Sequence, residues 1–310
     1  MAEKLKVAVL TGGISAERDI SFQSGRLVAD AIEKAGHEVV SFDIRPYNLS
    51  MLDDADIDVF FPAIHGTFGE DGQLQGILEQ RGLCYTGSGP QASRIAFDKE
   101  ECKRLLRKTE IPLPKDIFVT SGDNIERLSG KILSLGETVV VKPVSDGSSF
   151  GVQIIEAENA PAEAVKTFKE FGSCMVEEFI AGREITIGIL NGEALPIIEI
   201  RSKTGFYDYQ AKYISDSTEY LFDTIDDAEL AAKINSIAVE SFNLIGCRHF
   251  GRVDMILSDT SVPYFLEINT LPGFTSHSLL PKAANKAGLS NSQLCMEIIE
   301  TAMRDFNRKV

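Results

Sequence analysis

Two neighbouring apolar segments near the C-terminal end of the chain, 251–257 and 262–269, constrain its fold more than any other feature. Their sequences, GRVDMIL and VPYFLEIN, predict two adjacent β-strands. Side chains alternate between the two faces of a sheet along each strand. We therefore expect Arg252, Asp254 and Ile256 to share one face of the first strand.

The second strand should place Phe265, Glu267 and Asn269 on one face by the same alternation. Asp254, Glu267 and Asn269 would then converge as oxygen donors, the ligands that hold Mg²⁺ together with substrate phosphates. The alternative is an antiparallel hairpin with a solvated polar face. That alternative explains less well an apolar strand that ends in Glu-Ile-Asn and runs into a Pro-Gly turn, so we favour a metal site.

The length and the charge of the chain limit its class and its partners. A chain of 310 residues, of which 44% are hydrophobic, predicts two domains, or three, with a sizeable core. The net charge is −15, from 46 acidic and 31 basic residues. This balance argues against a nucleic-acid or anionic-membrane partner, because nucleic acids and anionic membranes attract positive surfaces. An anionic substrate remains compatible, since a local cluster of lysines can override the global charge.

The cysteines and the N-terminal segment indicate a cytoplasmic protein. The five cysteines are widely spaced and form no CxxC pair, so we expect neither a disulfide framework nor a zinc site. No segment approaches the roughly 20 apolar residues of a membrane helix. The N-terminal segment, MAEKLKVAVLTGG, contains an apolar run that is too short for a signal peptide. Three cysteines stand in apolar contexts and are expected in the core: Cys84, Cys174 and Cys247.

A β-α-β rhythm opens the chain and predicts a parallel sheet with flanking helices. This first unit should end near residue 95. A helix that ends at Gly36 should follow the first strand. The expected strands cover 6–10, 37–44 and 58–64, and a second helix covers 73–80.

Two further units are expected after the first. The second begins at residue 97 with a basic helix and alternates strands with helices, the pattern of a compact α+β lobe. The third begins near Arg183 with a long hairpin. Its polar stretch 201–220 exceeds the usual length of a structureless loop, which favours a functional role. Helices are expected at 227–246 and from about Asn291.

Residues 139–152, VVVKPVSDGSSFGV, place Lys142 between an apolar strand and a Gly/Ser loop. Backbone amides in such a loop can hold phosphate oxygens, and a lysine adds positive charge. The GxxxxGK[ST] order of a Walker A loop is missing, and a glycine-rich turn beside an edge lysine is the alternative. Lys99, in FDKEECKR, would by itself belong to the solvated face of an amphipathic helix.

Residues 175–187, MVEEFIAGREITI, bring acidic side chains to the end of a strand. Backbone groups there can pair with the edge of a purine, and a carboxylate such as Glu184 can bind ribose hydroxyls. A charged loop between two strands explains this segment equally well when it is taken alone.

Two strands of the first unit end in polar residues. GGISAERDIS carries Glu17, and PAIHGTFGEDG carries His65 at the end of a buried strand. The dinucleotide fingerprint GxGxxG is absent, although the first loop can still present amides at a helix N-terminus. A single histidine here is more often structural. Ligand sites gather at the carboxyl ends of parallel strands, so a carboxylate and an imidazole together favour a site.

In combination, these motifs resemble the ATP-grasp enzymes and, within them, the D-alanine–D-alanine ligases. Nine segments match in order: GGISAERDIS, HGTFGEDGQLQGILE, YTGSG, FDK, VVKPVSDGSSFGV, EEFIAGREIT, FYDYQAKY, GRVD and LEINTLPGFTSHSLLPKAA. The resemblance implies three α/β domains rather than two: an N-terminal parallel-sheet substrate domain at 1–96, a central ATP-grasp lobe at 97–182, and a C-terminal lobe at 183–310 with a lid at about 201–220.

The resemblance also implies the residues that bind ATP and metal. The two lysines would contact the phosphates, the segment 177–180 would face the adenine, and Glu184 would bind the ribose. Asp254, Glu267 and Asn269 would hold two Mg²⁺ ions, with Mn²⁺ as an alternative ion. The full set of implied ATP contacts is Lys99, Lys142, Ser148, Ser149, Glu177, Glu178, Phe179, Ile180, Glu184, Phe206, Lys212 and Ile256.

For the substrates, the resemblance implies two amino-acid subsites and a cytoplasmic homodimer that joins two D-alanines at the expense of ATP. The first D-alanine would meet Glu17 and His65. The implied contacts of the second are Arg252, Ser278 and the Leu279 amide, and Lys212 is a further implied substrate contact. Arg252 and the Gly273 amide would stabilise an oxyanion, and the implied network that joins the loop to the N-terminal domain consists of Tyr213, Ser148 and Glu17.

Three alternatives stay open on the sequence. The first is a different ATP-grasp carboxylate–amine ligase, against which the FYDYQAKY and HSLLP segments argue. The second is a catalytically silent nucleotide-binding regulator, which would be expected to lack some of the lysine or metal positions that this chain retains. The third is a dinucleotide-dependent oxidoreductase, weakened by the missing GxGxxG.

Overall fold

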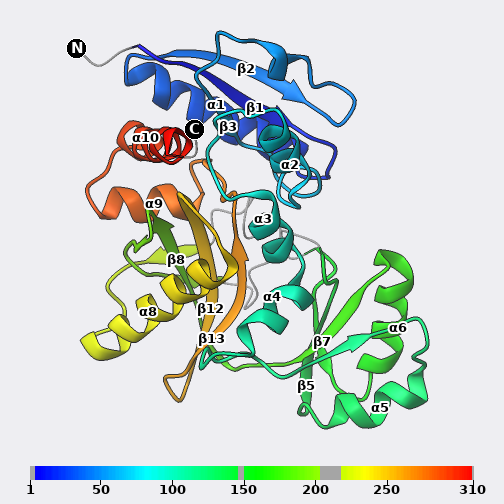
Figure 1. The fold of residues 1–310 in the computed structure, drawn as a ribbon. Coiled ribbons are helices and arrows are strands. Elements are labelled where there is room, and N and C mark those ends of the chain that lie inside the picture. Colours follow the sequence, from blue (N-terminus) through cyan, green and yellow to red (C-terminus); the bar gives the residue numbers. More distant parts are fainter. Residues whose placement is uncertain (1–3, 146–149, 203–217, 309–310) are drawn as a thin grey trace.

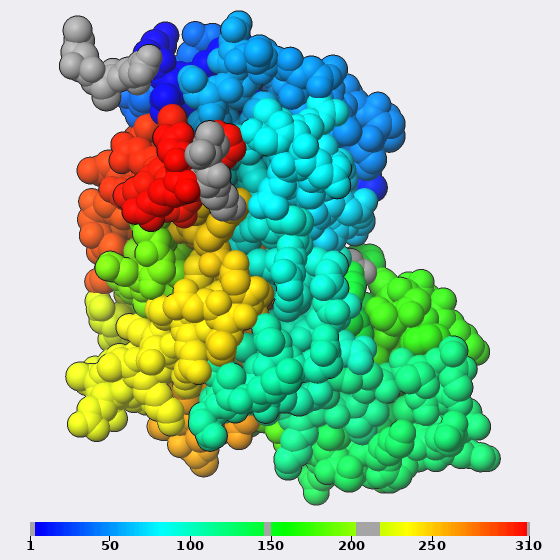
Figure 2. Space-filling view, in the orientation of Figure 1, coloured from blue at the N-terminus to red at the C-terminus, as the bar shows by residue number. Residues whose placement is uncertain are grey.

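Three β-sheets with flanking helices make up the protein, as a computed structural model shows (Figure 1). The structure describes residues 4–145, 150–202 and 218–308. The space-filling view shows the central unit, coloured teal to green, as a lobe that projects from the rest of the molecule (Figure 2). The mixed α/β class expected from the sequence is confirmed.

The N-terminal sheet is parallel, as its β-α-β rhythm predicts, with strand order β2-β1-β3. Its central strand is almost wholly buried, which is typical of a parallel strand with helices on both sides. The elements of this unit are β1 (Lys6–Gly12), α1 (Arg18–Lys34), β2 (Glu38–Ile44), the 3₁₀ helix η1 (Ser50–Asp53), β3 (Val59–Pro62) and α2 (Gln73–Gln80).

The central sheet is antiparallel, and the helices α5 and α6 cover one of its faces (Figure 1). Alternation along its strands divides their residues between two environments. Val139 and Val141 point into the core beneath the helices, whereas Val140 and Lys142 line a cleft on the other face. The elements are β4 (Asp116–Val119), α5 (Ile125–Leu133), β5 (Thr138–Lys142), β6 (Gln153–Glu156), α6 (Ala160–Phe171) and β7 (Cys174–Glu178).

The C-terminal sheet has the strand order β11-β10-β8-β12-β13, and its helix α8 covers the face opposite the cleft. The Asp227 side chain caps the N-terminus of α8, and Gly246 ends the helix with a positive φ of 83°. The elements are β8 (Gly182–Leu190), β9 (Glu193–Ala194), β10 (Ile198–Arg201), β11 (Glu219–Leu221), α8 (Ala228–Ile245), β12 (Phe250–Ser258), β13 (Pro263–Asn269), α9 (Leu279–Lys286) and α10 (Asn291–Asn307).

A β-bulge at Leu266 makes one expectation for the paired strands wrong. β12 and β13 are antiparallel neighbours, but the register shifts after Asp254, which pairs with Glu267, so that Met255 pairs with Phe265. Phe265 is therefore in the core with Met255 and does not share the face of Glu267. One extra residue in a strand reverses the alternation beyond it, and the hydrophobic pattern alone does not reveal such an insertion.

Two short α-helices were not predicted from the sequence. The helix α3 (Pro90–Phe97) precedes α4 (Lys99–Leu106), and proline occupies its first turn. The second unpredicted helix is α9. Cys84, Cys174 and Cys247 are buried, as expected, and so are the other two cysteines, Cys102 and Cys295; all five are free thiols. Among the described residues, the helices are too short or too polar to cross a membrane.

An aromatic cluster joins the N-terminal sheet to the C-terminal one. Phe61 of β3, Phe250 of β12 and Phe274 have ring centroids 5.6–6.1 Å apart. The C-terminal helix α10 also lies against α1 (Figure 1), and the Ser292 hydroxyl donates to the Ala31 carbonyl at 2.7 Å. One continuous core therefore connects elements from the two ends of the chain.

Replacing Phe250 by alanine should lower the free energy of unfolding by about 3–5 kcal/mol, because its fully buried ring would leave a cavity within this cluster. Equilibrium urea unfolding measures the loss. Leu133→Ala is the control: this side chain is 52% exposed, and its loss should stay within about 0.5 kcal/mol. Equal losses in the two variants would show that the aromatic cluster does not stabilise the junction.

Candidate active site

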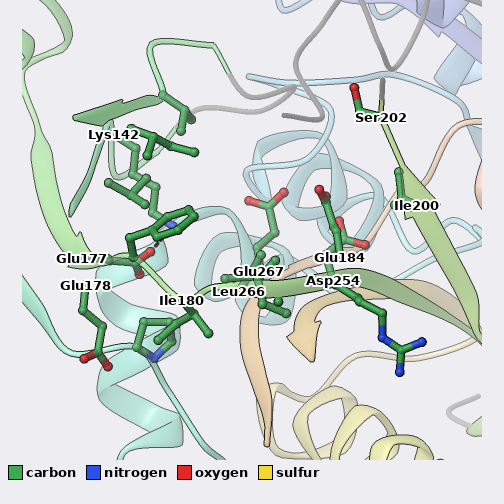
Figure 3. Close-up of a pocket in the computed structure, with 18 of the residues that line it drawn as sticks. Lys142, Glu177, Glu178, Ile180, Glu184, Ile200, Ser202, Asp254, Leu266 and Glu267 are labelled. Atoms are coloured by element: carbon green, nitrogen blue, oxygen red, sulfur yellow. Dashed lines mark ion pairs between the residues drawn. The ribbon is translucent and has the colours of Figure 1, made fainter. Parts of the chain in front are cut away.

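A cleft of about 390 Å³ lies between the inner faces of the central and C-terminal sheets (Figure 3). Strands β5, β6 and β7 form one wall, and β8, β10, β12 and β13 form the other. Ten of the residues predicted for ATP or metal binding line it: Lys99, Lys142, Glu177, Glu178, Phe179, Ile180, Glu184, Asp254, Ile256 and Glu267.

Two lysines enter the cleft from different elements. Lys142 is the last residue of β5, and its Nζ lies 2.6 Å from Glu177 Oε2. Lys99 is the first residue of α4, and its Nζ lies 3.5 Å from Glu267 Oε2. Asp98 fixes this helix start because its side chain accepts a hydrogen bond from the Glu101 amide. The cleft thus holds two cations that can meet an anionic ligand.

Glu177 is a buried carboxylate held between two lysines. Its other oxygen, Oε1, lies 2.7 Å from the Nζ of Lys103, a residue that the sequence interpretation missed. Burial alone raises the pKa of Glu177, but Lys142 and Lys103 outweigh burial and hold its pKa below the usual range. Lys103 stands one helical turn after Lys99, and that i,i+4 spacing was the available signal.

Apolar side chains form the walls of the cleft beyond the lysines. Phe150 is 58% exposed and Phe179 is 42% exposed, so both rings present open apolar surface. Ile180, Ile200 and Leu266 face the same space (Figure 3). Clefts that combine flat apolar walls with a few charged groups suit a heterocyclic ligand with polar substituents.

Two further glutamates of the cleft, Glu184 and Glu178, point in different directions. Glu184 lies on β8 between Ile200 and Ile256 of the neighbouring strands. The Glu178 carboxylate accepts a hydrogen bond from the backbone amide of Lys115 at 2.9 Å. Figure 3 shows the side chain of Glu178 pointing away from Glu184 and Asp254. Glu184 is therefore the better placed of the two to meet a ligand hydroxyl.

The predicted metal ligands lie on facing positions of β12 and β13. Asp254 pairs with Glu267, and Arg252 pairs with Asn269, so these side chains share the cleft face. Arg252 donates to both oxygens of Asp254, at 2.9 and 2.7 Å, and the Thr186 hydroxyl donates to Oδ1 at 2.5 Å. The Asp254 carboxylate is thus fixed in orientation.

This donor set fits Mg²⁺ held with phosphates. Mg²⁺ takes oxygen ligands and is usually bound through one or two carboxylates plus substrate phosphates. Asp254 and Glu267 supply two carboxylates, and Asn269 supplies a side-chain amide oxygen. This oxygen already accepts a hydrogen bond from the backbone amide of Leu271 at 3.0 Å. Within the described part of the chain no group of three or more His, Cys, Asp or Glu side chains gathers as an all-protein metal cage.

A second polar cluster lies at the carboxyl edge of the N-terminal sheet. Ser24 links His65 to the segment around Phe274. Its hydroxyl lies 3.1 Å from His65 Nε2 and accepts a hydrogen bond from the Phe274 backbone amide at 3.2 Å. A Cβ on Gly273 would lie 3.8 Å from His65 Nε2 and 2.8 Å from the Ser278 hydroxyl. The structure therefore brings the predicted substrate residues His65, Gly273 and Ser278 together, with Leu279 starting the adjacent helix α9.

Glu17 and Glu70 set the electrostatics of this cluster. A Cβ on Gly66, the neighbour of His65, would lie 3.0 Å from Glu17 Oε2, and Glu70 Oε1 lies 4.0 Å from His65 Nδ1. Burial lowers the pKa of His65, but Glu70 and, to a smaller extent, Glu17 outweigh burial and hold it above the ordinary value. The cluster can therefore hold an imidazolium between two carboxylates.

Five of the predicted site residues fall on segments outside the described residues: Ser148, Ser149, Phe206, Lys212 and Tyr213.

Comparison with known proteins gives consistent matches along the chain. Residues 105–300 match the family model for the D-ala D-ala ligase C-terminus, and residues 48–88 match the one for the N-terminus. A D-alanine–D-alanine ligase from Methylacidiphilum infernorum is 40% identical over 295 residues, which cover 95% of this chain and 94% of the relative.

Two solved structures share the fold. A D-alanine–D-alanine ligase from Bacillus anthracis, complexed with ATP, superposes with a TM-score of 0.84 at 34% identity, covering 99% of this chain and 100% of that one. The VanG D-Ala:D-Ser ligase from Enterococcus faecalis superposes with a TM-score of 0.82 at 29% identity, covering 97% and 100%.

Two antiparallel sheets that enclose a cleft with paired lysines and paired carboxylates define the ATP-grasp fold, as expected from the sequence. Within that class, the chain belongs to the D-alanine–D-alanine ligase family.

Replacing Glu70 by glutamine should lower the pKa of His65, because burial disfavours the imidazolium and Glu70 is the main group that opposes burial. Two-dimensional NMR of the histidine rings across pH measures the midpoint, with His65→Gln to assign the signal.

The same change should alter the pH dependence of stability. A folded-state pKa above the ordinary histidine value of 6.5 adds stability that is fully present below pH 6.5 and is lost as the pH rises through the folded-state pKa. Glu70→Gln should remove part of this dependence. An unchanged His65 midpoint in the variant would contradict the assigned cause.

Proposed function

We propose that the protein joins two D-alanine molecules into D-alanyl-D-alanine at the expense of ATP. The observation that carries this proposal is the pairing of two sites in one chain: a cleft with two lysines and facing carboxylates, and a His65–Glu17 cluster at the edge of the neighbouring sheet. The 40% identity to a D-alanine–D-alanine ligase over nearly the full length supports the choice of substrates.

The reaction would proceed in two steps. The carboxylate of the first D-alanine attacks the γ-phosphate of ATP, which gives D-alanyl phosphate and ADP. The amine of the second D-alanine then attacks the acyl carbon, and phosphate leaves through a tetrahedral intermediate. Phosphoryl transfer depends mainly on positioning and charge neutralisation, and Lys99 and Lys142 supply both. Arg252 and the Gly273 amide would stabilise the oxyanion of the second step.

The substrates would bind at the second cluster. Glu17 would meet the ammonium of the first D-alanine beside His65, and Ser278 with the Leu279 amide would hold the carboxylate of the second. Asp254, Glu267 and Asn269 would hold two Mg²⁺ ions, which neutralise phosphate charge when bound. The proposed remaining contacts, with the loop and lid, are Ser148, Ser149, Phe206, Lys212 and Tyr213.

The wider setting follows from this function. We propose domains at 1–96, 97–182 and 183–310, with the lid at about 201–220 excluding water from the acyl phosphate. The product would serve peptidoglycan precursor synthesis and hence cell-wall biogenesis and cell shape, in the cytoplasm. We propose a homodimer, with neither a nucleic-acid partner nor membrane insertion.

ADP release from ATP and Mg²⁺ tests the proposal, with D-alanine, L-alanine, D-lactate and D-serine compared side by side. The structural likeness to a D-Ala:D-Ser ligase favours one second candidate, in which D-serine is the acceptor. Mass analysis of the product from D-alanine plus D-serine separates the two. Release that does not depend on D-alanine would refute both.

Glu267→Gln should lower turnover by several orders of magnitude, because it removes one of the two carboxylates proposed to hold the metal. Steady-state kinetics at saturating Mg²⁺ measure the loss, and circular dichroism checks the fold. Glu126→Gln, on the exposed side of α5, is the matched control and should leave turnover unchanged. Turnover close to wild type in Glu267→Gln would remove the metal assignment.

Glu17→Gln should weaken the binding of the first D-alanine more than the binding of ATP or of the second D-alanine. Only the ammonium of the first D-alanine would lose its carboxylate partner. A truncated charge pair of this kind costs about 2–5 kcal/mol. Initial-rate analysis with each substrate varied in turn separates the three constants. If all three constants change equally, Glu17 has only a structural role.

A further inference from the structure

A buried lysine without a role in the reaction proposed above lies behind the cleft. Lys103, on α4, is 1% exposed. Its Nζ lies 2.7 Å from Glu177 Oε1 and 2.6 Å from Asp116 Oδ2, and it donates to the Pro114 carbonyl at 2.8 Å. A buried lysine costs free energy unless its charge is paired, so these partners determine what it can do.

The carboxylate of Glu177 is shared between Lys103 and a lysine of the cleft. Glu177 Oε2 lies 2.6 Å from Lys142 Nζ, and Oε1 faces Lys103. If Glu177 were the counter-ion of Lys142 alone, the pair would be neutral. Two lysine charges against one carboxylate leave a net charge of +1. Asp116 does not cancel this charge, because it is also paired with Arg107.

The helix α4 connects this buried triad with the other cleft lysine. Lys99 and Lys103 are four residues apart and so lie on one face of the helix. Lys99 reaches into the cleft, 3.5 Å from Glu267 Oε2, while Lys103 reaches Glu177 behind the cleft. One short helix therefore supplies a cation to the cleft directly and acts on a second cation through Glu177.

We propose that Lys103 is a positioning residue for the nucleotide phosphates: by neutralising Glu177, it keeps the charge of Lys142 available to ATP and fixes that side chain at the end of β5. This inference rests on the proposed ATP-dependent function and adds a residue to its site.

Lys103→Met tests the inference, because methionine keeps the length and apolar stem of the side chain and removes the charge. Calorimetric titration with ATP and with adenosine, both without metal, separates phosphate binding from binding of the nucleoside. We expect the affinity for ATP to fall about tenfold or more, the usual size for a lost interaction with a charged group, while the affinity for adenosine stays the same. Equal losses for both ligands, or no loss for ATP, would overturn the inference.

Arg107→Met is the matched control. It removes a cation from the same cluster, but Arg107 pairs with Asp116 rather than Glu177, and its side chain is 46% exposed. The ratio of ATP to adenosine affinity should stay at the wild-type value. A fall equal to that in Lys103→Met would show that the general field of the cluster, and not the sharing of Glu177, controls phosphate binding.

The double variant Lys103→Met/Glu177→Gln keeps the test decisive even where Lys103→Met does not fold. It removes one cation and the anion that would otherwise cancel Lys142, so the ratio of affinities should return toward the wild-type value. A ratio that stays low would overturn the inference. Wild-type protein that neither binds ATP nor releases ADP with D-alanine would instead refute the proposed function itself.

Discussion

The charge of one buried carboxylate determines how the central sheet can be built. Glu177 is 2% exposed on β7, and burial disfavours its ionised form. It stays ionised because Lys142 approaches from the neighbouring strand and Lys103 from α4. The same contacts align β5, β7 and α4 with one another. The positions of Lys142 in the cleft and of Lys103 behind it therefore follow from the need to compensate a charge inside the lobe.

Alternation along the strands then decides what faces the cleft. Val139 and Val141 face the helices and leave Lys142 on the opposite face, and Ile185 and Ile187 do the same for Glu184. Such residues were predictable because the period of two is visible in the sequence. The carboxylates Asp254 and Glu267 were predictable for the same reason, and they face each other across β12 and β13.

The sequence failed where a position depends on a contact between distant segments. Phe265 was expected beside Glu267, but the bulge at Leu266 turns it into the core. The sequence predicts that Lys103 belongs to a solvated basic helix. Only the fold shows that Lys103 pairs with Glu177, which is 74 residues away in the chain. Ser24 likewise connects His65 with Phe274, and Phe274 lies 250 residues after Ser24 in the chain. Short helices such as α9 lack a long periodic pattern and were missed for that reason.

The distribution of charge reconciles an acidic protein with a highly anionic ligand. A chain with a net charge of −15 repels a nucleotide at long range, so any attraction must act at short range inside the cleft. Lys99 and Lys142 provide it where water is partly excluded and the effective dielectric constant is lower. Acidic side chains nearby limit this attraction: Glu267 lies beside Lys99, and Glu177 lies beside Lys142. The two cases differ, because Glu267 can give its charge to a metal ion, whereas Glu177 is buried and can be neutralised only from within the protein. A lysine in the core is therefore the means by which the cleft keeps a positive charge at the end of β5.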